Sequence, residues 1–355
     1  MSHVLDVADL RDRVRKALDE FLSGQVSALD SIAVELGPAA EKVRDFVLDG
    51  GKRLRPAFCY WGWRGAGGPD VDEIVTAAAS LELLQACALI HDDVMDGSDT
   101  RRGRPSLHRG FAALHRGESW LGDPEAFGTS AAILLGDLCL IWADQLLNTS
   151  GLPGDVLRRG AATYDEMRVE LMAGQYLDLL EQVLGGRDVE RARRVARYKS
   201  AKYTIERPLQ LGGVLAGGAP AVLATYTAYG LPLGEAFQLR DDLLGVFGDP
   251  AETGKPAGDD LREGKRTVLV ATALQRARPD EAAVVRRHLG DPHLDEEGVA
   301  ALRTVIDETG ARAEVESLIS ELTDRALAAL SSGAVHDEAR TVLEDLAAAA
   351  TARRV

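Results

Sequence analysis

The sequence predicts an all-α protein, because apolar residues recur at helical spacing along nearly the whole chain and alternating strand patterns are hard to find. Alanine and leucine are abundant, whereas aromatic residues make up only 5% of the chain. In chain order, the segments with helical spacing are 4–30, 38–48, 54–64, 71–97, 124–148, 153–184, 188–216, 219–247, 263–278, 294–308, 310–332 and 335–352. Several are long and apolar on more than one face, which predicts a single large helical bundle around a central cavity.

Short breaks separate these helices, at Gly65–Pro69, Gly151–Gly154, Gly185–Gly186 and Gly248–Gly258. None of them has the length or composition of a clear interdomain linker, and no repeat of solenoid length is visible. We therefore expect residues 1–355 to form a single all-α domain.

Charge and cysteine content exclude several classes of protein. The chain carries 41 Lys and Arg residues against 56 Asp and Glu residues, for a net charge of −15, so it lacks the cationic surplus of a protein that wraps nucleic acid. Its three cysteines, Cys59, Cys87 and Cys139, are far apart among apolar neighbours, which argues against a disulfide framework or a zinc site and fits a reducing cytosol. The N-terminus has no apolar signal core, and Asp137 interrupts the most apolar stretch, so we expect a cytoplasmic protein without a membrane span.

An acidic motif ends one of the most apolar predicted helices. In Leu-Ile-His-Asp-Asp-Val-Met-Asp, residues 89–96, Asp92 and Asp96 are four residues apart and project from one helix face. Gln85 lies on the same face, seven residues before Asp92. Like charges at this spacing repel each other unless a cation compensates them. Taken alone, the motif is equally compatible with a solvated acidic helix end.

A second acidic motif, Phe-Gln-Leu-Arg-Asp-Asp-Leu-Leu-Gly, makes solvation a poor explanation. Gln238 and Asp241 share a face near the end of another apolar helix. Oxygen ligands on two helices suit Mg²⁺, which fills its remaining coordination positions with water and substrate phosphates. The pair His91-Asp92 invites a metal phosphohydrolase of the HD type, but the other six histidines form no matching pattern.

Cationic residues flank both acidic motifs. Gly50-Gly51-Lys52-Arg53-Leu54-Arg55 places three cations after a glycine pair, whose backbone N–H groups favour an anion. Arg101 and Arg102 follow the first motif, and a later helix carries Lys199 and Lys202. Lys255 and Lys265 follow the second motif. In an acidic protein, such clusters beside carboxylates indicate a site for metal and diphosphate.

With these residues in order, the sequence closely resembles the trans-isoprenyl diphosphate synthases, the head-to-tail prenyltransferases. The resemblance runs from GGKRLRP at residue 50, through LIHDDVMD and FQLRDDLLG, to EGKRT at residue 263. It implies an all-α homodimer that condenses isopentenyl diphosphate with an allylic diphosphate by ionisation, condensation and elimination. No single motif would carry the resemblance, but the motifs in this order do.

The resemblance also assigns roles to individual residues. Asp92 and Asp96, with Asp93 in support, would hold two Mg²⁺, and Asp241, assisted by Asp242, a third; Mn²⁺ could substitute. The allylic diphosphate would be bound by Arg101, Lys199, Lys255 and Lys265. Isopentenyl diphosphate would be bound by Lys52, Arg55, Gln85 and Arg102. Ser200 and Gln238 would offer oxygens to the developing allylic cation, and Gln175 and Asp178 would line the cavity near the metals. Gly245 departs from the family pattern, because it stands where the last aspartate of the second motif is usual.

Product length should depend on the residues one turn before Asp92. Cys87 and Ala88 are both small, whereas relatives that stop at fifteen carbons often carry bulky aromatic residues there. We therefore expect geranylgeranyl diphosphate as the product, with farnesyl or longer-chain polyprenyl diphosphates as the alternative. A class I terpene cyclase would lack the second Asp-Asp motif, and a non-catalytic synthase subunit would have lost aspartates from one of the motifs. The alternative explanation is that Cys87 and Ala88 are small merely because helix packing requires it.

Overall fold

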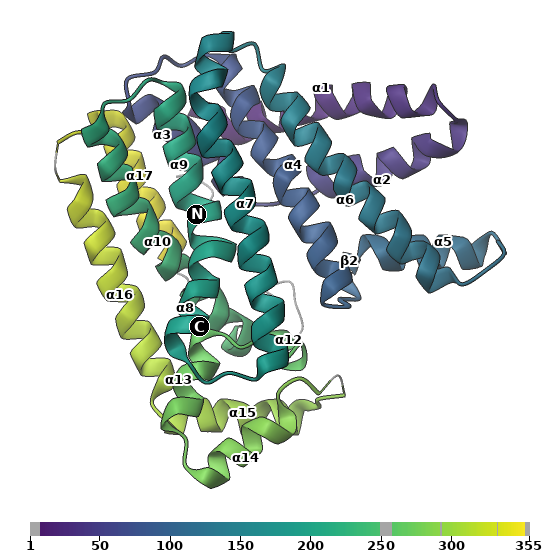
Figure 1. Cartoon of the computed structure of the whole chain (residues 1–355), viewed down its shortest axis with the longest axis vertical. Coiled ribbons are helices and arrows are strands. Elements are labelled where there is room, and N and C mark those ends of the chain that lie inside the picture. The colour runs from purple at the N-terminus through teal and green to yellow at the C-terminus, as the bar shows by residue number, and fades with distance from the viewer. Residues whose placement is uncertain (1–7, 249–257, 292, 332, 352–355) are drawn as a thin grey trace. The chain divides into compact units, whose positions relative to one another are not determined.

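The computed structural model describes residues 8–248, 258–291, 293–331 and 333–351, and these form an all-α structure as the sequence predicts (Figure 1). The one sheet in this part of the chain is a small antiparallel hairpin, formed by β1 (Thr100–Arg101) and β2 (Arg104–Pro105). Two compact units divide the chain: Met1–Tyr60 with Gly68–Arg158, and Trp61–Gly67 with Arg159–Val355. Two of the boundaries fall inside α3 (Leu54–Gly65) and α7 (Gly154–Leu184), and the third falls between α3 and α4 (Asp72–Met95). The expectation of a single domain stays a prediction.

The first unit is built around two long helices that pack side by side, α4 (Asp72–Met95) and α6 (Pro124–Asn148) (Figure 1). Alanines and leucines on α4 are buried on several faces, and acidic residues in its first turn favour the positive helix end. Asp123 caps α6 by accepting a hydrogen bond from the backbone N–H of Glu125. The unit is completed by α1 (Leu10–Asp30), η2 (Val34–Leu36), α2 (Gly37–Leu48), the hairpin and α5 (Leu107–Gly117).

The second unit surrounds α10 (Pro220–Phe247), which packs against the π-helix η3 (Ala196–Glu206) and against α16 (Ala311–Leu330). Two buried tyrosines on α10 are satisfied by backbone carbonyls: the Tyr226 hydroxyl donates to Gly62 and the Tyr229 hydroxyl donates to Leu343. The other helices are α8 (Val189–Val195), α9 (Arg207–Leu215), α12 (Asp259–Arg262), α13 (Val268–Arg276), α14 (Pro279–His288), α15 (Glu296–Glu308) and α17 (Asp337–Thr351).

Several boundaries differ from the sequence prediction. The segment 188–216 is not one α-helix but α8, the π-helix η3 and α9 in succession. Segment 263–278 becomes the shorter α13, because Gly264 adopts a φ of +74° that ends the preceding turn. Neither α5 nor α14 is evident from periodicity. Both are short, and α5 contains two glycines, so packing of its apolar face rather than local propensity stabilises it.

Two helices, α4 and α6, are long and apolar enough to cross a membrane by length and composition alone. The apolar part of α4 is 72% buried inside the protein, as in the core helix of a folded domain. The corresponding part of α6 is only 39% buried. Its exposed apolar side chains include Phe127, Leu134 and Ile141, at intervals of seven residues.

Candidate active site

The first acidic motif lies at the C-terminal end of α4. Asp92 is in the last turn, and Asp96 follows the last helical residue, with its backbone N–H donating to the Asp92 carbonyl over 2.8 Å. The two carboxylates are therefore one turn apart, as their spacing predicts. The C-terminal end of a helix carries partial negative charge, which adds to that of the carboxylates. The local field favours a cation.

Arg101 connects the hairpin to this acidic end. Its Nε donates to Asp93 Oδ1 over 2.8 Å, and a terminal nitrogen lies 3.6 Å from Asp92 Oδ2. Asp93 is 1% exposed, so its charge is compensated within the protein. The hairpin turns at Arg102 and Gly103, whose φ angles of +55° and +74° are those of a two-residue turn of type I′. The turn brings β1 back against β2, so that Arg101 pairs with Arg104 across the hairpin.

A buried arginine supports the cationic loop before α3, and sequence reasoning gave it no role. Arg53 is 7% exposed; it donates to Glu82 over 2.5 Å and to the carbonyl of Val47 over 2.8 Å. From the sequence alone, Arg53 cannot be distinguished from the neighbouring cations Lys52 and Arg55. Only burial separates the structural cation from its two partly exposed neighbours.

Arg102 belongs to the same cationic cluster. It donates to the carbonyl of Phe46 over 3.3 Å, and its guanidinium lies 5.6 Å from the centre of the Phe46 ring. Burial lowers the pKa of Arg102, Glu82 opposes that shift, and the charges of Arg53, Arg101 and Arg55 lower the pKa further. Three arginines, Arg53, Arg55 and Arg101, therefore lie close enough to Arg102 to affect its charge, and a group of cations of this kind suits a diphosphate.

Three predicted residues upstream on α4 have different environments. Gln85 is half-buried, and its Oε1 is buried without a hydrogen-bond partner in the described part of the chain. Cys87 is fully buried, with its Sγ 3.8 Å from His91 Nδ1, and burial followed by the charge of Asp137 raises its pKa to about 12. Ala88 is only half-buried. Of the two proposed chain-length residues, Cys87 is thus the one enclosed by α6.

In the second unit, a glycine positions the π-helix that carries Lys199 and Ser200. A Cβ atom added to Gly174 would lie 2.3 Å from the backbone nitrogen of Lys199, so only glycine allows α7 and η3 to approach this closely. Lys199 Nζ then pairs with Asp178 Oδ2 over 2.7 Å. The structure joins Lys199 and Asp178, which the sequence analysis assigned separately, and π-helical turns are found frequently at functional sites.

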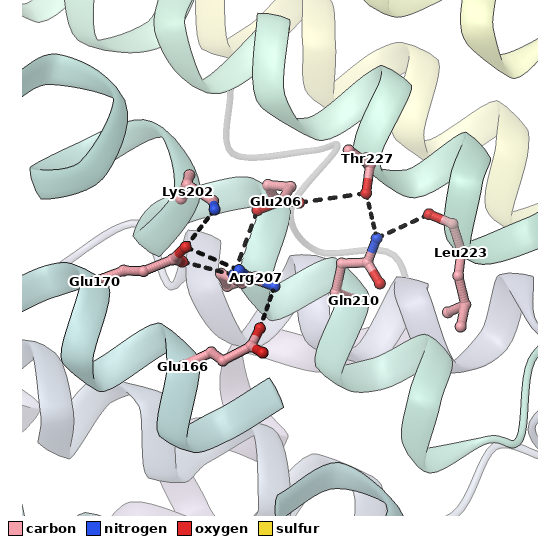
Figure 2. A network of polar contacts seen from close by, with 8 residues as sticks. All are labelled: Glu166, Glu170, Lys202, Glu206, Arg207, Gln210, Leu223 and Thr227. Carbon is pink, nitrogen blue, oxygen red and sulfur yellow. Dashed lines mark hydrogen bonds and ion pairs between the residues drawn. The ribbon is translucent and has the colours of Figure 1, made fainter. Parts of the chain in front are cut away.

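The other end of η3 is held by a polar network (Figure 2). Glu170 on α7 accepts hydrogen bonds from Lys202 and from both Nε (2.7 Å) and a terminal nitrogen (2.9 Å) of Arg207. Arg207 also pairs with Glu166 over 3.0 Å, and the Thr227 hydroxyl donates to Glu206 over 3.3 Å. This network fixes the register of η3 against α7. Lys202 is therefore satisfied inside the protein, although in sequence it resembles Lys199.

The second acidic motif lies near the C-terminal end of α10. Gln238 Nε2 donates to Asp242 Oδ1 over 2.7 Å, and Asp241 is half-buried beside it. Burial raises the pKa of Asp242 to about 8; the hydrogen bond from Gln238 and the charge of Lys265 lower it, whereas Asp260 and Asp241 raise it. Lys265 Nζ lies 2.5 Å from Glu263 and 3.5 Å from Asp260. Lys255 lies outside the described residues.

Both acidic motifs fit a hard divalent cation. Carboxylate oxygens are the ligands that Mg²⁺ prefers, and the excess of negative charge around the buried Asp242 is what a cation would relieve. Among the residues that the structure describes, no group of three or more His, Cys, Asp or Glu side chains forms a closed metal cage. Mg²⁺ is commonly held by one or two carboxylates together with substrate phosphates, which matches these sparse acidic pairs.

The all-α fold and the two acidic motifs are those expected of helical enzymes that bind diphosphate esters with a divalent metal. The sequence model of the polyprenyl synthetase family matches residues 38–306. A solved geranylgeranyl pyrophosphate synthase from Corynebacterium glutamicum, complexed with isoprenyl diphosphate and magnesium, is 47% identical, with a TM-score of 0.94 over 97% of this chain and 99% of that chain.

Curated relatives include proteins with different products. A geranylfarnesyl diphosphate synthase from Aeropyrum pernix is 32% identical over 79% of this chain and 83% of its own length. An octaprenyl diphosphate synthase from Escherichia coli is 32% identical over 80% of both chains. The chain belongs to the polyprenyl synthetase family and is a trans-polyprenyl diphosphate synthase, a transferase of isoprenoid biosynthesis, and the magnesium in the complex of the C. glutamicum relative is consistent with Mg²⁺ dependence.

Proposed function

We propose that the protein condenses isopentenyl diphosphate with an allylic diphosphate to give geranylgeranyl diphosphate. The observation that carries the proposal is that the hairpin carrying Arg101 and Arg102 follows the acidic pair Asp92 and Asp96 on the same unit, with Arg101 3.6 Å from Asp92. Such a pairing of cations and metal-binding carboxylates suits a diphosphate leaving group. The relative from C. glutamicum, which is complexed with isoprenyl diphosphate and magnesium, supports the assignment of substrate and metal.

Lys52, Arg55, Gln85 and Arg102 bind isopentenyl diphosphate in this proposal. Arg101, Lys199, Lys255 and Lys265 bind the allylic diphosphate, and three Mg²⁺ are held by Asp92, Asp96 and Asp241. When bound, Mg²⁺ neutralises the charge that develops on the departing diphosphate. Ionisation is therefore favoured when cations and a divalent metal stabilise the leaving diphosphate.

The remaining steps need few side chains. The double bond of isopentenyl diphosphate attacks the allylic cation, and a proton is then lost to the diphosphate that has departed, so no side-chain base is required. Gln238 already donates through Nε2 to Asp242, which leaves its carbonyl oxygen as the group offered to the cation. Ser200, in the π-helix, offers a hydroxyl oxygen.

The proposed product length rests on Cys87 and Ala88. Two small side chains leave room in the chain tunnel for one more isoprene unit than two bulky side chains would. A homodimer in the cytoplasm completes the proposal. The exposed apolar face of α6 supports the dimer, since a contiguous patch of this kind usually marks a protein–protein contact. Three buried thiols without disulfide partners are compatible with a reducing compartment.

The test is incubation of the purified protein with labelled isopentenyl diphosphate, Mg²⁺ and allylic primers of five, ten or fifteen carbons, followed by mass spectrometry of the products. A twenty-carbon diphosphate is the expected main product. A fifteen-carbon or longer product would replace the proposed chain length but keep the reaction. A cyclised hydrocarbon, or no product without an added partner protein, would contradict the proposed reaction itself.

A further inference from the structure

The π-helix η3 is in close backbone contact with α7 on one side and with α10 on another. A Cβ atom added to Gly174 of α7 would lie 2.3 Å from the backbone nitrogen of Lys199. A Cβ atom added to Gly234 of α10 would lie 2.5 Å from the carbonyl oxygen of Ala201. Both contacts are with main-chain atoms, which cannot turn aside as the end of a side chain can. The two neighbouring helices therefore fix the position of the η3 backbone at these points.

The helix type of η3 determines where its first residues point. π-helical turns are rare and mostly occur singly, whereas η3 is π-helical over 11 residues. An α-helix turns through about 100° per residue, so a shift of η3 by one residue position would turn the Lys199 side chain through a similar angle, away from Asp178. The pairing of Lys199 Nζ with Asp178 Oδ2, over 2.7 Å, therefore depends on the geometry of the whole segment.

Glu170 holds the C-terminal end of η3 (Figure 2). Its carboxylate accepts hydrogen bonds from Lys202 in η3 and from Arg207, the first residue of α9, so it joins the last turn of η3 to the next helix. The Glu170 side chain is 18% exposed, so water screens these ion pairs only in part. Glu170, Gly174 and Asp178 follow one another at intervals of four residues along α7, and all three contact η3. One face of α7 thus supports η3 from end to end.

We propose that Glu170 is a positioning residue for the allylic diphosphate. By holding the C-terminal end of η3, it keeps this segment π-helical, and this geometry places Lys199 and Ser200 for the substrate. Glu170 itself touches no substrate in this proposal. The inference rests on the proposed function, which assigns the allylic diphosphate to Lys199 and the allylic cation to Ser200. It predicts that loss of the Glu170 charge impairs the use of one substrate and not of the other.

The first experiment measures steady-state kinetics of the full-length protein with both substrates. Glu170→Gln keeps the shape of the side chain but removes its charge. It should raise the KM for the allylic diphosphate about 10-fold, the effect of losing one hydrogen bond to a charged group, and leave the KM for isopentenyl diphosphate unchanged. Glu166→Gln is the matched control and should behave like the wild type, because Glu166 also pairs with Arg207 but is 62% exposed. An equal rise in both KM values of Glu170→Gln, or none, would overturn the proposal.

The second experiment asks whether Glu170 acts through Lys199. Lys199→Ala removes the group that Glu170 is proposed to place, so adding Glu170→Gln to it should cause little further loss of kcat/KM for the allylic diphosphate. If the two losses multiply instead, Glu170 acts independently of Lys199 and the proposal is wrong. Thermal unfolding of every variant sets an assay temperature at which all of them are folded, so that lost stability is not mistaken for lost positioning.

Binding separates this inference from the proposed function. If the wild type forms no prenyl product, the proposed function fails, and titration calorimetry with the Mn²⁺ complex of inorganic diphosphate decides the inference. Glu170→Gln should then bind this complex about 10-fold more weakly than Glu166→Gln and the wild type, and equal affinity would overturn the inference. If the wild type forms product but Glu170→Gln keeps both KM values of the wild type, only the inference about Glu170 fails.

Discussion

Two lysines three residues apart on η3 illustrate how the ion-pair partners of a charge decide its role. Lys199 pairs with Asp178 and Lys202 with Glu170, both on α7. Glu170 also accepts from Arg207, so Lys202 belongs to a network that is satisfied within the protein. Lys199 pairs instead with Asp178, which the sequence analysis expected to line the cavity near the metals. We therefore expect Lys199, and not Lys202, to serve the substrate.

Separate substitutions should distinguish the two diphosphate sites. Lys52→Ala and Arg55→Ala are expected to raise the KM for isopentenyl diphosphate, because they remove charge from the cluster that contains Arg102. Lys199→Ala and Lys265→Ala should instead impair use of the allylic diphosphate. Each lost contact should cost about 1.5–3 kcal/mol in kcat/KM, the range of hydrogen bonds to charged groups. The measurement is steady-state kinetics with both substrates. If all four variants lost the same kcat/KM for both substrates, the two pockets would be wrongly assigned.

Removing the proposed metal ligands one at a time should abolish turnover. Asp92→Ala, Asp96→Ala and Asp241→Ala each leave the diphosphate charge without a bridging cation, so kcat should fall by orders of magnitude. Activity should require Mg²⁺ or Mn²⁺, and measurements across a chelator titration would reveal this. Full turnover in excess chelator would refute the requirement.

Product length provides a test at Cys87 and Ala88. Phenylalanine at both positions should shorten the main product to fifteen carbons, as measured by mass spectrometry of the extracted diphosphates. Ala88→Phe alone is the cleaner variant, since Ala88 is half-buried whereas Cys87 is enclosed against His91 and its enlargement should also lower stability. An unchanged product length in an active Ala88→Phe protein would place the floor of the tunnel elsewhere.

At the scale of elements, the network on α7 and η3 makes stability depend on pH. Burial raises the pKa of Glu170, but hydrogen bonds from Arg207 and Lys202 outweigh burial and hold this pKa below its usual value. A carboxyl whose pKa is lower in the folded state stabilises the fold above its unfolded pKa, and this contribution disappears as the pH falls through the folded value. Glu206 has the opposite behaviour, because burial keeps its pKa raised.

We therefore expect Glu170→Gln to lower the free energy of unfolding at pH 7 by roughly 1–3 kcal/mol, with a smaller difference from the wild type at pH 4. Glu206→Gln should stabilise the protein at pH 7 or leave it unchanged, because it removes a charge that burial disfavours. Urea unfolding at both pH values measures the two effects. A Glu170→Gln variant as stable as the wild type at pH 7 would show that the network contributes nothing to stability.

At the scale of the whole molecule, the exposed apolar face of α6 predicts self-association. Leu134 is 64% and Ile141 is 59% exposed, one heptad apart on the same face. Burying such a face against a second copy would remove this apolar area from water, and apolar interfaces of that kind are typical of permanent dimers.

Sedimentation velocity should therefore find a dimer for the wild type. Leu134→Glu with Ile141→Glu should give a monomer, because two charges would be buried without partners in the contact. Ile32→Glu, which introduces the same charge at another exposed apolar residue, is the control and should leave the dimer intact. A monomeric wild type would contradict the prediction.

The sequence by itself determined the all-α class, most of the long helices and the two acidic motifs, because each depends on periodicity or on spacing within one helix. Asp92 and Asp96 share a face through local geometry alone. The role of Arg53, the division of 188–216 by a π-helix and the pairing of Lys199 with Asp178 were decided only by tertiary structure. Each depends on contacts between segments distant in sequence. Spacing along one helix cannot reveal a group that arrives from another.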